Sequence, residues 1–143
     1  MSKPYKIPLQ AMPISDDGYH IFVEMEVNEH TVNMLLDTGA SRTFFDSSKL
    51  KKIIKELALE VNEDRATGLG SDDVENFITE VKQIKIGKLI INDFQIGVLD
   101  LSHVNKSYKR MDIRPITGVL GSDILVKYGA IINFAEDSLV FSK

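Results

Sequence analysis

The feature of this sequence with the clearest chemical potential is a carboxylate that enters a glycine turn at the end of an apolar strand. Asp37, Thr38 and Gly39 follow a short apolar run and precede two small residues, Ala40 and Ser41. A carboxylate held in this way can act as a general base toward water. An aspartate at such a position can also simply cap a β-turn. Chemistry therefore requires a partner group.

One carboxylate alone cannot hydrolyse an amide. Without a metal or a covalent intermediate, one carboxyl takes a proton from water while another gives a proton to the carbonyl or the leaving amine. Two carboxyls a few ångströms apart share one proton. The chain has no second Asp-Thr-Gly or Asp-Ser-Gly, and Asp46, Asp100 and Asp123 lack the same context. The economical solution is a two-fold dimer that brings Asp37 of each chain to the symmetry axis.

The sequence gives little indication of other catalytic chemistry, and we predict no metal and no cofactor. The three histidines are scattered without ligand spacing, and the chain has no cysteine. The acidic residues that follow Gly70 do not form an EF-hand pattern. Gly68 and Gly70 lack the strand-to-helix context of a dinucleotide site, and no phosphate-binding loop is present.

The bulk composition is that of an ordinary globular protein. With 143 residues, 43% of them hydrophobic, the chain predicts a single domain over residues 1–143. A net charge of −4 argues against a nucleic-acid partner. One basic cluster is interpreted as a solvated loop because it lacks a stacking platform. It consists of Lys106, Lys109, Arg110 and Arg114.

The cellular location is predicted from the first residues and from hydropathy. No stretch reaches transmembrane length, so we expect no membrane association. The beginning of the chain has no apolar segment of the secretory type. We therefore expect a cytoplasmic protein if this N-terminus is native, and a secreted or periplasmic one if a signal was removed.

The elements that must position Asp37 are mainly strands. Residues 19–27 alternate between apolar and polar types, and a turn at 28–30 joins them to a strand at 31–36 that ends at Asp37. Further strands are predicted at 43–45, 74–86, 89–91, 94–99 and 116–120, with a closing hairpin from 130–134 and 139–141. Many short strands and tight turns indicate a mostly-β, closed, barrel-like fold.

One or two short helices complete the prediction. The first begins at Ser47 or Ser48 as cap and ends near Leu59, since residues 50, 53, 54 and 57 repeat at helical spacing. The second covers residues 124–128, with Ser122 as cap and Gly129 as terminator. Residues 102–115 are polar and are predicted to form a loop.

The motifs of this sequence together resemble those of a known protein family. The segment 35–41 is similar to the active-site strand and loop of retropepsin-like aspartic proteases, which include the retroviral proteases and small bacterial relatives. The segment 118–121, Gly-Val-Leu-Gly, is similar to their second signature, and the glycine turn 68–70 lies between the two, where the family has its flap. The start of the second helix and the segment 128–134 resemble the bacterial members most.

The resemblance implies a fold and roles for individual residues. The fold would be a closed β-barrel acid-protease half-domain with a flap hairpin. Asp37 would be the catalytic acid and base, Thr38 would hydrogen-bond across a homodimer, and Gly39 would allow close approach of substrate. Ala40 and Ser41 would bind a polypeptide substrate together with the flap residues. These flap residues are Gly68, Leu69 and Gly70.

Two positions depart from the retroviral pattern and leave rival hypotheses open. Those proteases carry an acidic residue where Ser41 stands and an arginine where Ser122 stands, so their stabilising pair must be replaced here. The leading hypothesis is an aspartic endopeptidase. The alternatives are a catalytically silent peptide-binding or dimerisation module on the same fold, and a protease that processes one dedicated partner.

Overall fold

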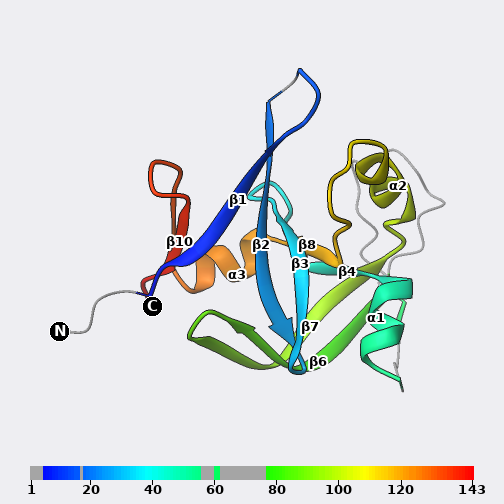
Figure 1. Cartoon of the computed structure of the whole chain (residues 1–143). Helices are drawn as coiled ribbons and strands as arrows, with labels where there is room; N and C mark the ends of the chain where they lie inside the picture. The colour runs from blue at the N-terminus through cyan, green and yellow to red at the C-terminus, as the bar shows by residue number, and fades with distance from the viewer. Residues whose placement is uncertain (1–4, 17, 56–59, 62–76) are drawn as a thin grey trace.

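The computed structural model describes residues 5–16, 18–55, 60–61 and 77–143. These residues form ten strands and three helices (Figure 1). No helix among them combines the length and the apolarity that a membrane span requires. The elements are β1 (Ile7–Pro13), β2 (Tyr19–Val27), β3 (His30–Leu36), β4 (Phe44–Asp46), α1 (Ser47–Ile53), β5 (Glu60–Val61), β6 (Phe77–Ile86), β7 (Leu89–Leu99), α2 (Ser102–Arg110), β8 (Gly118–Leu120), α3 (Ser122–Lys127), β9 (Ala130–Asn133) and β10 (Ser138–Phe141).

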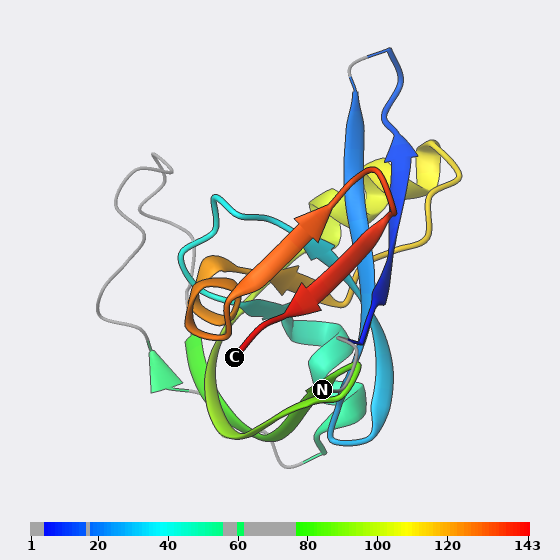
Figure 2. The ribbon, with the colours of Figure 1, turned by 90° about the vertical axis from the view of Figure 1, so that its left-hand side faces the viewer.

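Six of the described strands close into a barrel, which confirms the predicted mostly-β barrel. Their order is β6-β7-β4-β8-β3-β2, and the ring closes where β2 pairs with β6. The β3–β8 and β4–β7 pairings are parallel and the other pairings of the ring are antiparallel. Strands β1, β10 and β9 continue the sheet outward from β2. In Figure 2 the β9–β10 hairpin lies on the side of the barrel that faces the viewer.

The hairpin that delivers the candidate carboxylate forms as predicted. Strands β2 and β3 pair in register, with Val27 opposite His30. The two residues between them, Asn28 and Glu29, have φ values of 47° and 71°. Two consecutive left-handed residues match the right-handed twist of a tight hairpin. The end of β3 is therefore fixed by a short local turn.

Two apolar cores lie on opposite faces of the β2–β3 hairpin. The larger core fills the barrel, where alternate residues of β2 such as Val23 and Met25 are buried. The second core contains Phe22, Tyr108 and Ile113, and it packs α2 and its connection to β8 against the outside of the barrel. Ala40 packs against this second core, so α2 supports the loop that follows Asp37.

The prediction of a loop over residues 102–115 was wrong, since residues 102–110 form α2. Tyr108 is the buried residue of this helix, so the apolar periodicity that usually identifies a helix is missing. Tertiary contacts supply the stability instead. The Asn105 side chain exchanges two hydrogen bonds with Ile116, through its backbone oxygen (3.0 Å) and its N–H (2.8 Å). The Asp100 carboxylate accepts the Ser102 N–H at the start of the helix (2.9 Å).

The boundaries of the other two helices also differ from the prediction. Asp46 caps α1 by accepting the Lys49 N–H (3.0 Å), so the cap lies before the two serines, and α1 ends at Ile53. Helix α3 begins at Ser122 and its cap residue is Gly121, which has no side chain to offer. Strand β7 runs through residues 92–93 without a break, because its register with β6 is unchanged on either side.

Candidate active site

The backbone around Asp37 is fixed by neighbouring strands and by its own turn. The Asp37 N–H donates to the Leu120 oxygen at the end of β8 (3.0 Å), which continues the parallel β3–β8 pairing. The Asp37 carboxylate accepts the Gly39 N–H (2.9 Å), and its backbone oxygen accepts the Ala40 N–H (3.2 Å). The aspartate therefore caps the turn, and this turn also sets the orientation of its carboxylate.

The three residues of the predicted catalytic triplet lie together at the surface. Asp37, Thr38 and Gly39 are exposed, while Ala40 is half-buried and Ser41 is exposed. The carboxylate is thus open to water and to a second molecule. The other predicted binding residues, Gly68, Leu69 and Gly70, lie outside the described residues.

Helix α3 holds the other side of the loop. The Ser122 N–H donates to the Ala40 oxygen (2.7 Å), so the first turn of α3 is bonded directly to the candidate site. Glycine is required at position 121, because a Cβ there would lie 2.8 Å from the Ala40 oxygen and 2.9 Å from the Arg42 oxygen. This close approach explains why glycine directly precedes the helix.

A buried threonine and an aspartate on α3 are joined by short hydrogen bonds near the loop. The Thr43 side chain donates to Asp123 (2.7 Å), and the Thr43 N–H donates to the other oxygen of the same carboxylate (2.9 Å). The Thr43 hydroxyl also accepts the Gly121 N–H (3.0 Å), and Asp123 accepts the Ile124 N–H (2.9 Å). Thr43 is fully buried. We call these four bonds the Thr43–Asp123 clamp.

The Thr43–Asp123 clamp connects α3 to the chain that follows the Asp37 loop, where the sequence offered no ion pair. Ser41 and Ser122 cannot form an ion pair, and Arg42 donates to the Gln95 side chain at 3.4 Å. Asp123 instead joins α3 to the chain just after the loop by two bonds to one residue. Sequence reasoning missed both Thr43 and Asp123. The one signal present was an acidic residue in the first turn of α3.

A buried carboxylate, that of Asp46, organises the far end of β4. Asp46 accepts the Leu101 N–H (2.7 Å), the Ser48 hydroxyl (2.8 Å) and the Lys49 N–H (3.0 Å), and it is 2% exposed. It therefore ties the end of β4 to α1 and to the start of α2. Within the described ranges, no three His, Cys, Asp or Glu side chains gather into a metal site.

Comparisons with known proteins agree with this geometry. The sequence profile of a family described as aspartyl protease matches residues 23–124, which run from β2 to α3. A search of curated protein sequences returned no significant match.

Three solved structures have a similar fold. A retropepsin-like aspartic protease from Rickettsia conorii matches with a TM-score of 0.54 at 18% identity, over 99% of this chain and 95% of that chain. The retroviral protease-like domain of Ddi1 from Leishmania major matches with a TM-score of 0.55 at 15% identity, over 85% and 87%. The EIAV protease complexed with the inhibitor HBY-793 matches with a TM-score of 0.54 at 25% identity, over 86% and 100%. The protein therefore belongs to the retropepsin-like aspartyl proteases.

Proposed function

We propose that this protein is a homodimeric aspartic endopeptidase in which Asp37 and its symmetry mate activate one water molecule. The observation that carries the proposal is the surface position of Asp37, at the end of β3 and held by β8, within a chain of the aspartyl protease family. An exposed carboxylate of this kind is half of a catalytic pair. A second chain related by two-fold symmetry supplies the other half.

The two carboxyl groups divide the acid and base roles. The ionised one takes a proton from water, which attacks the peptide carbonyl, while the protonated one donates to the carbonyl oxygen. The amine then leaves with a proton from the dyad while a hydroxyl of the tetrahedral intermediate returns a proton to it, so the singly protonated dyad is restored. Activity needs one proton on two carboxyls, so the proposal predicts a bell-shaped pH profile.

The residues beside Asp37 hold the substrate and the partner chain. Thr38 bonds across the two-fold axis, and Gly39 lets the substrate backbone approach. Ala40 and Ser41 border an extended peptide that pairs with the loop as an added strand. Support for this arrangement comes from the way Ala40 is fixed on both sides, by the Asp37 oxygen and by the Ser122 N–H.

The surface that fits the second chain is the free edge of β9. This strand ends the described sheet, with β10 on its other side. The apolar side chains Ile131 and Phe134 are 54% and 61% exposed, and Val126 on the adjacent α3 is 73% exposed. An open strand edge beside exposed apolar side chains favours edge-to-edge pairing with another strand. Helix α3 also contacts the Asp37 loop, so the edge and the carboxylate share one rigid unit.

The proposal is tested by the turnover of a mixed peptide library between acidic and neutral pH. The wild-type chain should cleave it, and Asp37→Asn should not. Asp93→Asn is the matched control, since Asp93 is also exposed and its φ of 51° suits asparagine. Turnover by Asp37→Asn at the wild-type rate would remove the proposal.

The oligomeric state is tested separately by sedimentation. Ile131→Asp should weaken the dimer and the activity together, whereas Ile90→Asp should change neither, because Ile90 is equally exposed (51%) but lies on β7. A wild-type chain that stays monomeric when concentrated would contradict the dimer. That result would favour the catalytically silent peptide-binding module.

A further inference from the structure

Three basic side chains of residues 102–115, Lys106, Lys109 and Arg114, line a hollow on the side of the barrel opposite the free strand edge. The cavity has a volume of about 740 Å³, and its wall also includes the basic Lys49, the acidic Asp46 and Asp112, and Ile113. We call it the α2 groove. In Figure 1, α2 and the β9–β10 hairpin lie on opposite sides of the barrel. A partner in the groove would therefore leave the proposed dimer surface free.

Charge is strongly segregated between this segment and the rest of the chain. Residues 102–115 contain four basic side chains and one acidic one, which gives +3 in a protein whose net charge is −4. The remaining residues therefore carry −7. Salt bridges between described residues include none to Lys106, Lys109 or Arg110. Within the described part of the chain these cations therefore have no ion-pair partner, and the basic charge of the groove favours an external anion against the overall charge.

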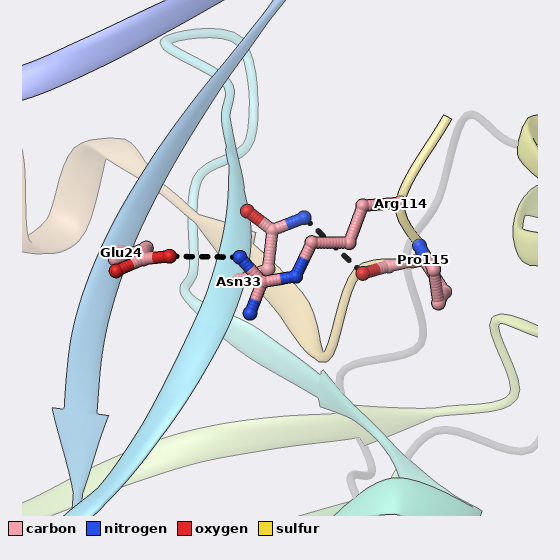
Figure 3. Close-up of polar contacts among 4 residues, drawn as sticks. All are labelled: Glu24, Asn33, Arg114 and Pro115. Atoms are coloured by element: carbon pink, nitrogen blue, oxygen red, sulfur yellow. Dashed lines mark hydrogen bonds and ion pairs between the residues drawn. The ribbon is translucent and has the colours of Figure 1, made fainter. Parts of the chain in front are cut away.

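The walls of the groove are held in place before any ligand arrives. Arg114 forms an ion pair with Glu24 (2.7 Å), and the Asn33 side chain donates to the Pro115 oxygen (3.1 Å), as Figure 3 shows. On the opposite wall, the buried Asp46 carboxylate fixes the start of α1. A rigid wall loses less conformational entropy on ligand binding than a flexible site does.

We infer that the α2 groove binds an acidic segment of a polypeptide. A long nucleic acid fits less well, since the rest of the protein repels it and the one aromatic residue of α2, Tyr108, is buried. A short stretch of glutamate or aspartate needs only the three lysines of the groove. Their ammonium groups would pair with its carboxylates.

The groove is close enough to Asp37 to act on the same substrate chain. Asp46 N–H bonds to the Thr117 oxygen just before β8, and Asp37 N–H bonds to the Leu120 oxygen at its other end. Three residues of strand separate these points, or about 10 Å. An acidic segment within about ten residues of the cut can therefore reach the groove. This use in substrate selection rests on the proposed peptidase function, but the binding itself does not.

Binding is tested with the full-length Asp37→Asn variant, so that no turnover is needed. The probes are a fluorescein-labelled Gly-Ser peptide with six consecutive glutamates and the same peptide with glutamines. Anisotropy should show binding of the glutamate peptide alone, and binding that weakens with added salt. A labelled single-stranded oligonucleotide is the third probe. An oligonucleotide that binds more tightly than the glutamate peptide would overturn the inference.

Charge-changing variants test whether the peptide binds in the α2 groove. Lys106→Glu with Lys109→Glu should weaken peptide binding at least about tenfold, because two attractive charges become repulsive. Lys51→Glu with Lys52→Glu makes the same change in net charge on exposed α1 residues outside the groove wall, and it should alter binding less than about threefold. Lys106→Gln with Lys109→Gln removes the two positive charges without adding negative ones. This variant should give an intermediate loss, and it remains informative if the glutamates disturb α2. Equal losses in the groove and α1 variants would refute a specific site.

Discussion

Removing the hydroxyl of Thr43 should destabilise the fold far more than removing an exposed threonine hydroxyl. Thr43→Val keeps the shape of the side chain but takes away a donor to Asp123 and the acceptor of the Gly121 N–H. Thr43 is fully buried, and the bond to Gly121 is buried with it. Water therefore cannot replace the hydroxyl as acceptor of the Gly121 N–H, whereas the half-buried Asp123 carboxylate can still be hydrated. The variant isolates the polar part of the Thr43–Asp123 clamp from packing.

The magnitude follows from the two lost bonds. A buried N–H without an acceptor costs about 1–3 kcal/mol, and the lost bond to a carboxylate adds about 1 kcal/mol after solvation. We expect Thr43→Val to lower the free energy of unfolding by about 2–4 kcal/mol, a large part of the roughly 5–15 kcal/mol of a typical domain. Thr31→Val is the matched control. Thr31 is exposed on β3, so its change should stay within about 0.5 kcal/mol.

The assay is urea-induced unfolding of the wild type and both variants at one protein concentration, because dimer formation makes stability concentration-dependent. The denaturant midpoint should fall in Thr43→Val while the slope of the transition stays constant. The rate of peptide cleavage should fall as well, since the clamp lies between α3 and the Asp37 loop. A Thr43→Val protein as stable as Thr31→Val would refute the assignment of the clamp as a main support.

Three further predictions concern the barrel and α2. Gly118→Ala should prevent stable folding, because the new methyl group would collide with the Phe44 oxygen, and circular dichroism would report the loss. Glu29→Gly should raise the free energy of unfolding by about 1 kcal/mol, since glycine adopts a φ of 71° without strain, whereas Glu29→Ala should give no gain. Burial raises the pKa of Tyr108 above 10.0, so the stability from its neutral form is present below pH 10 and is lost as the pH rises through the higher folded value. Tyr108→Phe should therefore lose less stability between about pH 9 and pH 12 than the wild type in urea titrations.

The sequence was sufficient for elements whose signal is local. The β2–β3 hairpin carries alternating residues and a polar turn, and it formed with the predicted strands. The same holds for the closing β9–β10 hairpin and for Gly129, whose φ of 62° is that of a helix terminator. The Asp37 turn was identifiable because strand, carboxylate and glycine are adjacent in the chain.

Features that depend on distant residues could not be predicted. Helix α2 presents one buried residue, Tyr108, and owes its place to a core assembled from β2 and the segment before β8. The Thr43–Asp123 clamp joins residues 80 positions apart, and neither residue has an unusual neighbourhood in the sequence. Asp46 was dismissed as lacking a strand-to-glycine context, yet it bonds to Leu101, 55 positions away. Such contacts become visible only when the barrel brings the segments together.

The claim that two chains share one catalytic site is tested most directly by mixing wild type with Asp37→Asn at constant total concentration. After subunit exchange, only dimers with two intact aspartates should cleave a peptide. An equal mixture should then retain about one quarter of the activity, and the activity should follow the square of the wild-type fraction. An equal mixture with about one half of the activity, falling linearly with the wild-type fraction, would show that each chain acts alone and would contradict the account.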